Sequence, residues 1–351
     1  MAGNKDAGTT STSTSTSTST SRKWATLRRG IAGGKAPGRM VPVGRGRRLH
    51  VIDARPPQAR AGVRVVAVAS AGTVALDWAG VLSALAALSD EDGRAGRVHA
   101  LAYDRAGLGW SPAAPGWLRP RTPQELAREL VELVEALDRE DGELPVVLVG
   151  HSLGGLIARA AAGLRPVAGL VLLEPTHAQR LYRPGTREPD RWVRAAIRTR
   201  MAGAVGVRRL QAITGGLPVH EAPAAWLPPD LQAATAWRLC GPTHQAAGLR
   251  ELAGLVTGGQ SVRALPLGDL PLRVFAAEPQ TRAELEGAEL DRQLLALSTD
   301  SALIPLPKAV GTRPHYNPHG AKLLAQRLDR LAGLILDAAG TSDPKDTAGP
   351  A

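Results

Sequence analysis

The sequence has few aromatic residues and almost no cysteine. Phenylalanine occurs once and tyrosine three times in 351 residues, so Leu, Val and Ala must build the core of a chain that is 44% hydrophobic. Small side chains of this kind favour close packing of helices on a sheet over an aromatic interior. The single cysteine, Cys240, excludes an intramolecular disulfide and has no metal-ligand pattern beside it, so we expect no metal site.

Long apolar runs are also absent. No segment approaches the ~18–20 consecutive apolar residues of a membrane span. The start of the chain lacks the apolar centre of a secretory signal, and it is rich in Ser, Thr and basic residues but poor in acids. We therefore expect no stable membrane span and a cytoplasmic location, with organellar import through this leader as the alternative.

Acidic residues are nearly missing from the first fifty residues. That segment holds ten Lys or Arg and one acid, Asp6, so it carries +9 of the net charge of +11 and leaves +2 for the other 301 residues. A body this close to neutral does not indicate a nucleic-acid-binding domain. We expect the leader to be solvated, although its charge could also attract an anionic membrane or nucleic acid.

Both ends of the chain lack apolar periodicity. Residues 9–21 alternate Thr and Ser, and Gly- and Arg-rich sequence follows. Such segments bury too little apolar surface to offset the entropy lost on ordering. The sequence predicts a disordered leader over residues 1–37 and a disordered tail over residues 341–351.

Between these ends, predicted strands alternate with amphipathic helices. This alternation is typical of a mostly parallel sheet with helices on both faces, that is, of the α/β class. The expected strands are Arg64–Ser70, Val98–Tyr103, Pro145–Val149, Gly169–Leu173 and Leu272–Ala277. A capping box at Thr122 to Glu125 predicts a helix start, and Leu324 to Ile335 predicts a closing helix.

One long region breaks the alternation. Residues 178–265 hold helical and Pro-rich segments with three tryptophans, Trp192, Trp226 and Trp237, and no clear strand. We predict a helical lid inserted into a core made of residues 38–177 and 266–340. Its Leu, Ala and Trp content favours a substrate with an apolar part.

The strongest motif is Gly150-His151-Ser152-Leu153-Gly154. It follows the predicted strand and precedes a predicted helix, which is the strand–turn–helix context of a nucleophile elbow. Glycines two residues before and after the serine remove side chains that would collide in so sharp a turn. The motif predicts Ser152 as a nucleophile.

Several segments in the same order resemble the α/β-hydrolase superfamily, specifically its bacterial serine-hydrolase branch. They cover about a third of the chain, between residues 63 and 177. The matching segments are Ala71-Gly72-Thr73, Leu76-Asp77-Trp78, Tyr103 to Ser111, the elbow, and Leu172-Leu173-Glu174-Pro175. The resemblance implies the α/β-hydrolase fold with a helical lid. The C-terminal third matches weakly.

The resemblance also implies an oxyanion hole made by two backbone amides. One belongs to Leu153 and the other to the loop after the first buried strand, where we predict Thr73 as the donor. Relatives often have His-Gly in that loop, whereas this chain has Ser70-Ala71-Gly72. We expect Asp104 and Arg105 to brace a loop or form a structural ion pair.

A histidine must act as general base, and the superfamily places it between the last strand and the closing helix. His315 and His319 lie there, and His315, in Pro314-His315-Tyr316, is similar to the usual Gly-His-aromatic pattern. We predict His315 as the base and His319 at the start of the helix. The turn at Ser152 is expected to direct the adjacent His151 elsewhere.

Two acids satisfy the chain order of nucleophile, acid and histidine. Glu278 follows Leu272–Ala277, where most superfamily members have their acid, but no glycine precedes it and a proline follows. Glu174 ends the strand next to the nucleophile strand, as in some lipases of the superfamily. We predict Glu174, with Glu278 as the alternative.

Together these residues predict a serine hydrolase that cleaves an ester, lactone, thioester or amide of a small molecule through an acyl-enzyme, without a cofactor. A non-catalytic binding or scaffold protein on the same fold is the alternative, and an acyltransferase would use the same residues. The sequence leaves the substrate and the oligomeric state open.

Overall fold

A computed structural model describes residues 37–54, 62–91, 97–116, 119–182, 189–214, 227–262, 265–279, 282–307 and 313–338. The predicted tail, and all of the predicted leader except Pro37, lie outside these residues. Within the described part of the chain, no helix is both long and apolar enough to cross a bilayer.

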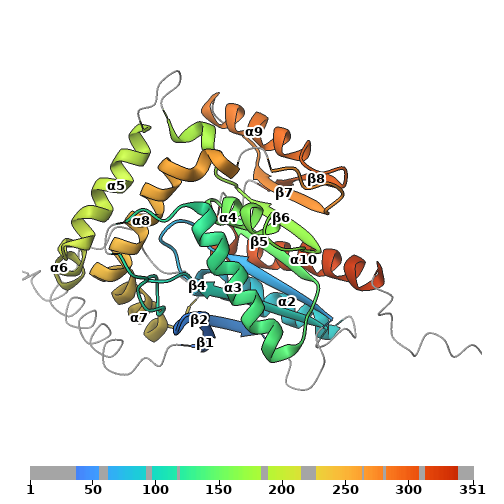
Figure 1. Cartoon of the computed structure of the whole chain (residues 1–351), viewed down its shortest axis with the longest axis horizontal. Helices are drawn as coiled ribbons and strands as arrows, with labels where there is room; N and C mark the ends of the chain where they lie inside the picture. Colours follow the sequence, from blue (N-terminus) through green and yellow to red (C-terminus); the bar gives the residue numbers. More distant parts are fainter. Residues whose placement is uncertain are drawn as a thin grey trace, which may run out of the picture.

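A single eight-stranded sheet forms the centre of the molecule (Figure 1). Its strands are β1 (Arg39–Val43), β2 (Arg47–Ala54), β3 (Val63–Val68), β4 (Val98–Asp104), β5 (Val146–His151), β6 (Gly169–Leu173), β7 (Leu272–Ala277) and β8 (Ser301–Leu306). Their order is β1-β2-β4-β3-β5-β6-β7-β8. Strand β2 runs antiparallel to both of its neighbours, and all other neighbouring strands pair in parallel.

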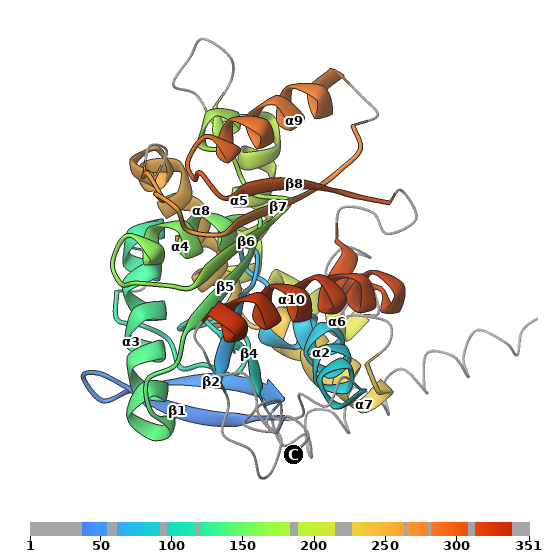
Figure 2. The same cartoon turned by 90° about the vertical axis from the view of Figure 1, so that its right-hand side faces the viewer.

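Helices cover both faces of the sheet. The helices of the core are α2 (Ala79–Glu91), α3 (Pro123–Asp141), α4 (Leu153–Ala162), α9 (Arg282–Leu295) and α10 (Pro318–Ala338). Helices α2 and α10 pack on one face, and α3 and α4 pack on the other (Figure 2). These layers confirm the predicted α/β class.

The central strands are buried on both faces, which explains their continuous apolar sequences. All six residues of β3 are buried. Val66 and Val68 join the core under α3 and α4, whereas Val65 and Ala67 join the core under α2 and α10. This alternation follows from the two-residue period of a strand.

The start of α3 has the predicted capping box. The Thr122 hydroxyl accepts a hydrogen bond from the Glu125 amide at 3.3 Å, and the Glu125 carboxylate accepts one from the Thr122 amide at 3.0 Å. Pro123 occupies the first turn, where its missing N–H costs nothing.

Three strands and one helix of the core were not predicted. Strands β1 and β2 are rich in arginine, which obscured their apolar alternation. Val41, Leu49 and Val51 are nevertheless buried, while Arg39 pairs with Asp53 and Glu140 at the surface. Helix α9 was not predicted either. Strand β8 was missed because Leu306 is its only buried residue, so its sequence shows no apolar alternation.

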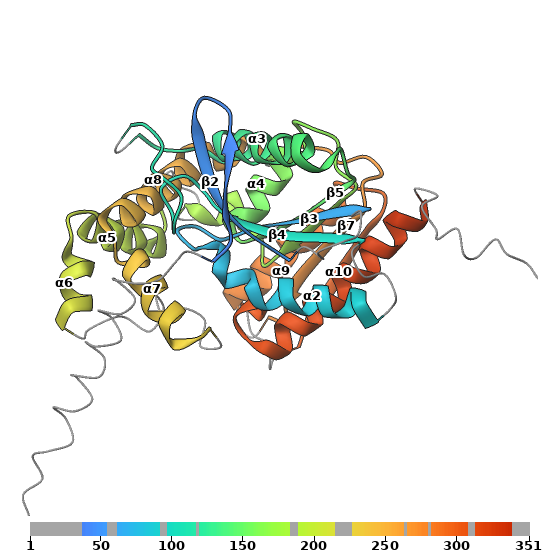
Figure 3. The same cartoon turned by 90° about the horizontal axis from the view of Figure 1, so that it is seen from below.

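The region predicted as an insertion lies between β6 and β7. Its helices are α5 (Arg191–Ala204), α6 (Val207–Thr214), α7 (Pro229–Leu239) and α8 (Pro242–Gly258), with 3₁₀ turns η2 (Ala178–Leu181) and η4 (Gly259–Val262). The described residues of this region contain one isolated β-bridge and no strand. Helices α5 to α8 gather at one end of the molecule, opposite the free end of α10 (Figures 1 and 3).

Candidate active site

Ser152 lies in the sharp turn between β5 and α4. Its φ of 53° and ψ of −117° are rare for a residue with a side chain. A Cβ at Gly150 would lie 2.3 Å from the Gly154 carbonyl oxygen, and a Cβ at Gly154 would lie 2.1 Å from the Val68 carbonyl oxygen. The two glycines are therefore required by close backbone approach, as the sequence analysis expected.

The end of β6 supports this turn. The Ser152 amide donates to the Leu173 carbonyl oxygen at 3.0 Å, and the Thr176 amide donates to the Ser152 carbonyl oxygen at 3.2 Å. The hydroxyl oxygens of Ser152 and Thr176 are 2.9 Å apart. Thr176 was not predicted, because its only signal in the sequence is its position just beyond a strand at the carboxyl edge of the sheet.

His315 lies in the 3₁₀ turn η6 (Pro314–Tyr316), before α10. Its buried ring stacks on Trp78 with the ring centres 4.7 Å apart and meets the edge of the His151 ring at 4.6 Å. Burial, helped by His151 and Arg313, holds the pKa of His315 well below its usual value. His315 is therefore neutral at pH 7.

The Nδ1 atom of His315 is buried and has no hydrogen-bond partner within the described part of the chain. No hydrogen bond therefore joins this atom to either candidate acid. His151, expected to be directed elsewhere by its turn, lies against the His315 ring instead. His319 is exposed in the first turn of α10, as predicted.

Glu174 follows β6 with a φ of 45°. Its carboxylate accepts a hydrogen bond from the Ala277 amide at 2.5 Å, which ties it to the end of β7. Burial raises the pKa of Glu174 to about 7, and the nearby Asp291 and Glu284 act in the same direction. Glu278, the alternative acid, lies one residue beyond β7 and is exposed.

The two predicted oxyanion donors differ in their surroundings. Leu153 is the first residue of α4, so its amide lies at a helix N-terminus, where anions are favoured. The Thr73 amide closes a turn by donating to the Ser70 carbonyl oxygen at 3.2 Å. The neighbouring Gly72 amide donates to Glu251 of α8 at 2.9 Å.

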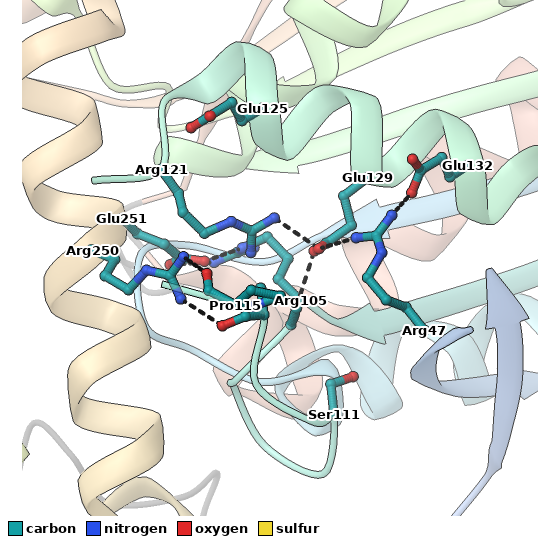
Figure 4. Close-up of polar contacts among 12 residues, drawn as sticks. Arg47, Arg105, Ser111, Pro115, Arg121, Glu125, Glu129, Glu132, Arg250 and Glu251 are labelled. Carbon is teal, nitrogen blue, oxygen red and sulfur yellow. Dashed lines mark hydrogen bonds and ion pairs between the residues drawn. The ribbon is translucent and has the colours of Figure 1, made fainter. Parts of the chain in front are cut away.

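Arg105 holds the same loop in place (Figure 4). Its guanidinium is fully buried and forms two bonds to the Glu251 carboxylate, at 2.6 and 2.9 Å. It also donates to the carbonyl oxygens of Ala69 and Ser70, each at 2.7 Å. Arg105 thus forms a structural ion pair, as expected, but its partner is Glu251 of the region predicted as a lid and not the neighbouring Asp104.

Asp104 braces the adjoining loops, also as predicted. Its buried carboxylate accepts hydrogen bonds from the amides of Ala75 and Trp110, at 2.7 and 3.0 Å. The Nδ1 atom of His50 lies 2.8 Å from the same carboxylate.

His244 of α8 makes a second link to the loop after β3. Its Nε2 atom lies 3.0 Å from the Gly72 carbonyl oxygen, and its Nδ1 atom accepts a hydrogen bond from the Gly109 amide at 3.1 Å. Burial lowers the pKa of His244 to about 3, so the ring is neutral and donates through Nε2.

A second His–acid pair lies near β6. The Nε2 atom of His177 is 2.8 Å from an Asp291 carboxylate oxygen, and both side chains are buried. His177 borders a cavity of about 140 Å³ together with Arg159 and Gln179. Asp291 could not be predicted from the sequence, because α9, which carries it, was not predicted.

The three tryptophans of the predicted lid occupy different environments. Trp192 on α5 is 48% exposed. Trp237 on α7 is covered by the guanidinium of Arg209, 3.6 Å from the ring centre. Trp226 lies outside the described residues.

Residues 65–340 match the Alpha/beta hydrolase family. The chain belongs to this family. Among curated proteins, Lipase LipV of Mycobacterium tuberculosis (strain ATCC 25618 / H37Rv) is 43% identical over 79 residues, which is 22% of this chain and 27% of the lipase. The similarity thus spans only about a quarter of the lipase.

Solved structures share the fold of this family member at low sequence identity. An esterase from Thermogutta terrifontis superposes with a TM-score of 0.56 and 18% identity, covering 86% of this chain and 99% of the esterase. An esterase from Exiguobacterium antarcticum gives a TM-score of 0.53 at 16% identity, covering 86% and 98%. A membrane phospholipase A gives 0.56 at 16% identity, covering 91% and 92%.

Proposed function

We propose that this chain is a serine hydrolase that cleaves an ester-like bond through an acyl-enzyme. The backbone of Ser152 carries this proposal. A strained serine at the tip of a strand–turn–helix, with the Leu153 amide beside it, is the geometry that nucleophilic attack on a carbonyl requires. The lipase and the esterases similar to this chain support the same class of reaction.

In this mechanism Ser152 attacks the carbonyl carbon and His315 takes its proton. His315 then gives that proton to the leaving group as its bond to the carbonyl carbon breaks, and water, activated by His315, releases the acyl group from Ser152. A base must be neutral before it accepts a proton, and the lowered pKa of His315 meets that condition. The Leu153 amide would stabilise the oxyanion, and the Thr73 amide would join it on releasing the Ser70 carbonyl oxygen. The Nδ1 of His315, which has no partner among the described residues, would donate to the triad acid, for which we propose Glu174, with Glu278 as the alternative.

Replacement of the nucleophile tests the reaction directly. Ser152→Ala should lower turnover of a p-nitrophenyl ester by several orders of magnitude, on the order of 10⁶-fold in the best-studied triads. Ser83→Ala, an exposed serine on α2, serves as the control and should keep wild-type turnover. More than about a tenth of wild-type activity in Ser152→Ala would refute the mechanism.

The acid can be identified by its pH dependence. Because the pKa of Glu174 is raised to about 7, its carboxylate is increasingly protonated below pH 7 and can no longer hold a histidinium. If Glu174 is the acid, kcat/KM rises through about pH 7, and Glu174→Gln loses on the order of 10⁴-fold. A crippled Glu278→Gln beside an active Glu174→Gln would reverse the assignment.

One observation favours the alternative of a non-catalytic binding protein. Ser152 contacts Thr176, and the Nδ1 atom of His315 has no partner in the described part of the chain, so no complete triad is joined by hydrogen bonds. A fluorophosphonate probe separates the two functions. Covalent labelling that is lost in Ser152→Ala supports the hydrolase, and absence of labelling in the wild type supports the binding protein.

We also propose that residues 178–265 set the substrate range as a lid. Trp192 and Trp237 differ in exposure and can be replaced one at a time, together with Trp226. A changed preference for acyl-chain length in at least one variant is expected from a panel of p-nitrophenyl esters. Unchanged preference in all three would contradict the lid.

A further inference from the structure

The outer face of α5 and α6 combines positive charge with exposed apolar side chains. Residues 189–214 contain six arginines and one acid, Asp190, in a body whose net charge is small. Asp190 caps α5 by accepting a hydrogen bond from the Trp192 amide at 3.1 Å. The charge of this segment is therefore not balanced by acids of its own.

Three arginines of α5 are available to a partner. Arg191, Arg194 and Arg198 are exposed. Within the described part of the chain, the side chains of these three arginines form no hydrogen bond or ion pair. Arg200, by contrast, is turned inward and donates to the Gly72 carbonyl oxygen at 3.3 Å. One face of α5 thus contacts the loop near Ser152, and the other presents arginine.

Large apolar side chains are concentrated on the same face. Of the nine most exposed large apolar residues in the described structure, five belong to α5, α6 and the residues joining them. They are Trp192 (48% exposed), Met201 (55%), Val205 (81%), Val207 (41%) and Leu210 (62%). Arg194, Arg198, Met201 and Val205 follow one another at intervals of four, three and four residues, so they form one line along the helix.

We propose that this face, residues 191–210, docks on an anionic lipid surface. Exposed apolar side chains can enter the headgroup region, while arginines keep their charged ends beside lipid phosphates and carboxylates. Tryptophan is favoured at the same depth. A nucleic acid or an acidic protein would satisfy the arginines but would leave Met201 and Val205 exposed without a function.

The position of the face suits such docking. Helices α5 and α6 lie on the outer flank of the molecule, away from α10, so a flat surface can approach them (Figures 1 and 3). The proposal concerns binding and does not depend on the reaction at Ser152. Ser152→Ala should therefore bind vesicles like the wild type, so failure of either proposal leaves the other standing.

Flotation of the full chain with lipid vesicles tests whether the arginines of α5 contribute to binding. Binding is expected with phosphatidylcholine vesicles that contain phosphatidylserine and not with phosphatidylcholine alone. Replacing Arg191, Arg194 and Arg198 by Gln should weaken binding on the order of 100-fold, since each basic residue near an anionic surface contributes about fivefold.

The charge control is a triple replacement on α10. Lys322, Arg327 and Arg330 are exposed, so changing them to Gln removes the same charge from the opposite end of the molecule. This variant should bind like the wild type. Equal weakening in both triple variants, or wild-type binding in the α5 variant, would overturn the proposal and assign binding to the general charge or to the basic N-terminal segment.

The contribution of the exposed apolar side chains to vesicle binding is tested with two double variants, one on the proposed face and one away from it. Met201→Ser with Val205→Ser should weaken vesicle binding at least tenfold, whereas Leu285→Ser with Leu334→Ser, of comparable exposure on α9 and α10, should not. Purely electrostatic binding, unchanged in the Met201/Val205 variant, would contradict a lipid surface and favour an acidic macromolecule. A dimer that dissociates in the same variant without vesicles would make the face a self-association surface and overturn the proposal.

Discussion

In the region between β6 and β7, helix α8 is attached to the core by many more buried residues and hydrogen bonds than helices α5 and α6 are. Helix α8 is buried along most of its length, and its Glu251, His244 and Arg250 bond to loops of the core. Helices α5 and α6 bury few residues, mainly Val193 and Gly203. Arg200 is the clear exception, because it reaches the loop after β3.

The difference indicates that residues 178–265 do not form one uniform unit. Arg250 bonds to the carbonyl oxygens of Ala114, Pro115 and Arg119, so α8 holds the loop after β4 as well as the loop after β3 (Figure 4). Because it makes these buried hydrogen bonds, α8 should contribute to the free energy of unfolding as a core helix does. Any movable lid would have to involve α5 and α6 and leave α8 in place.

The largest effect is expected from breaking the buried pair of Glu251 and Arg105. Glu251→Gln leaves a buried guanidinium without its countercharge and should cost about 3–5 kcal/mol of unfolding free energy. Urea denaturation measures this loss. Glu289→Gln, which breaks an exposed pair with Arg292, should cost less than about 1 kcal/mol. Similar losses would mean that α8 is held no more firmly than the surface.

Acid should weaken the attachment of α8 through His244. The pKa of His244 is about 3 in the folded chain and about 6.5 in the unfolded chain, so the unfolded state binds more protons between these values. Stability is therefore complete above about pH 6.5 and falls toward pH 3, by at most about 1.4 kcal/mol per pH unit. His244→Gln should have a flatter pH dependence in thermal unfolding, and an unchanged slope would exclude His244 as the cause.

Substitution of one glycine in α8 and one in α5 tests how closely each helix is packed against its neighbours. A Cβ at Gly254 of α8 would lie 1.8 Å from the Arg121 carbonyl oxygen, whereas a Cβ at Gly203 of α5 meets the side chain of Gln245 at 2.5 Å. A backbone carbonyl moves less easily than a side chain such as Gln245, whose Cγ is the nearest atom. Gly254→Ala should cost about 1–3 kcal/mol, and Gly203→Ala should cost clearly less, since alanine also favours the helix. Equal denaturation midpoints would contradict the comparison.

The smallest loss of unfolding free energy is expected when the contact between Arg209 of α6 and Trp237 of α7 is removed. Arg209→Gln removes a cation–π contact with Trp237 and should cost about 0.5–1 kcal/mol. The same denaturation assay checks it, with Arg327→Gln, an exposed arginine on α10, as the control. A loss as large as that of Glu251→Gln would show that α6 is also anchored to the core.

Much of the fold could be predicted because its signals are local. The buried strands β3 to β7 are short apolar runs, the start of α3 is a capping box, and the elbow at Ser152 needs glycines within two residues on either side. Strands β1, β2 and β8 were missed because arginines or half-exposed positions interrupt their patterns. Their pairing depends on neighbours that are distant in the sequence.

The candidate site likewise has features that the sequence alone predicts and features that depend on residues far apart in the sequence. By itself, the sequence determined that Ser152 follows a strand in a turn that requires glycine two residues before and two residues after it, because that constraint lies within five residues. Only the tertiary structure decided that Thr176 meets its hydroxyl, that Trp78 and His151 enclose His315, and that Glu251 reaches Arg105 and the Gly72 amide. These contacts join residues up to 237 positions apart, as with Trp78 and His315. Packing of the chain as a whole sets such distances, and no local pattern records them.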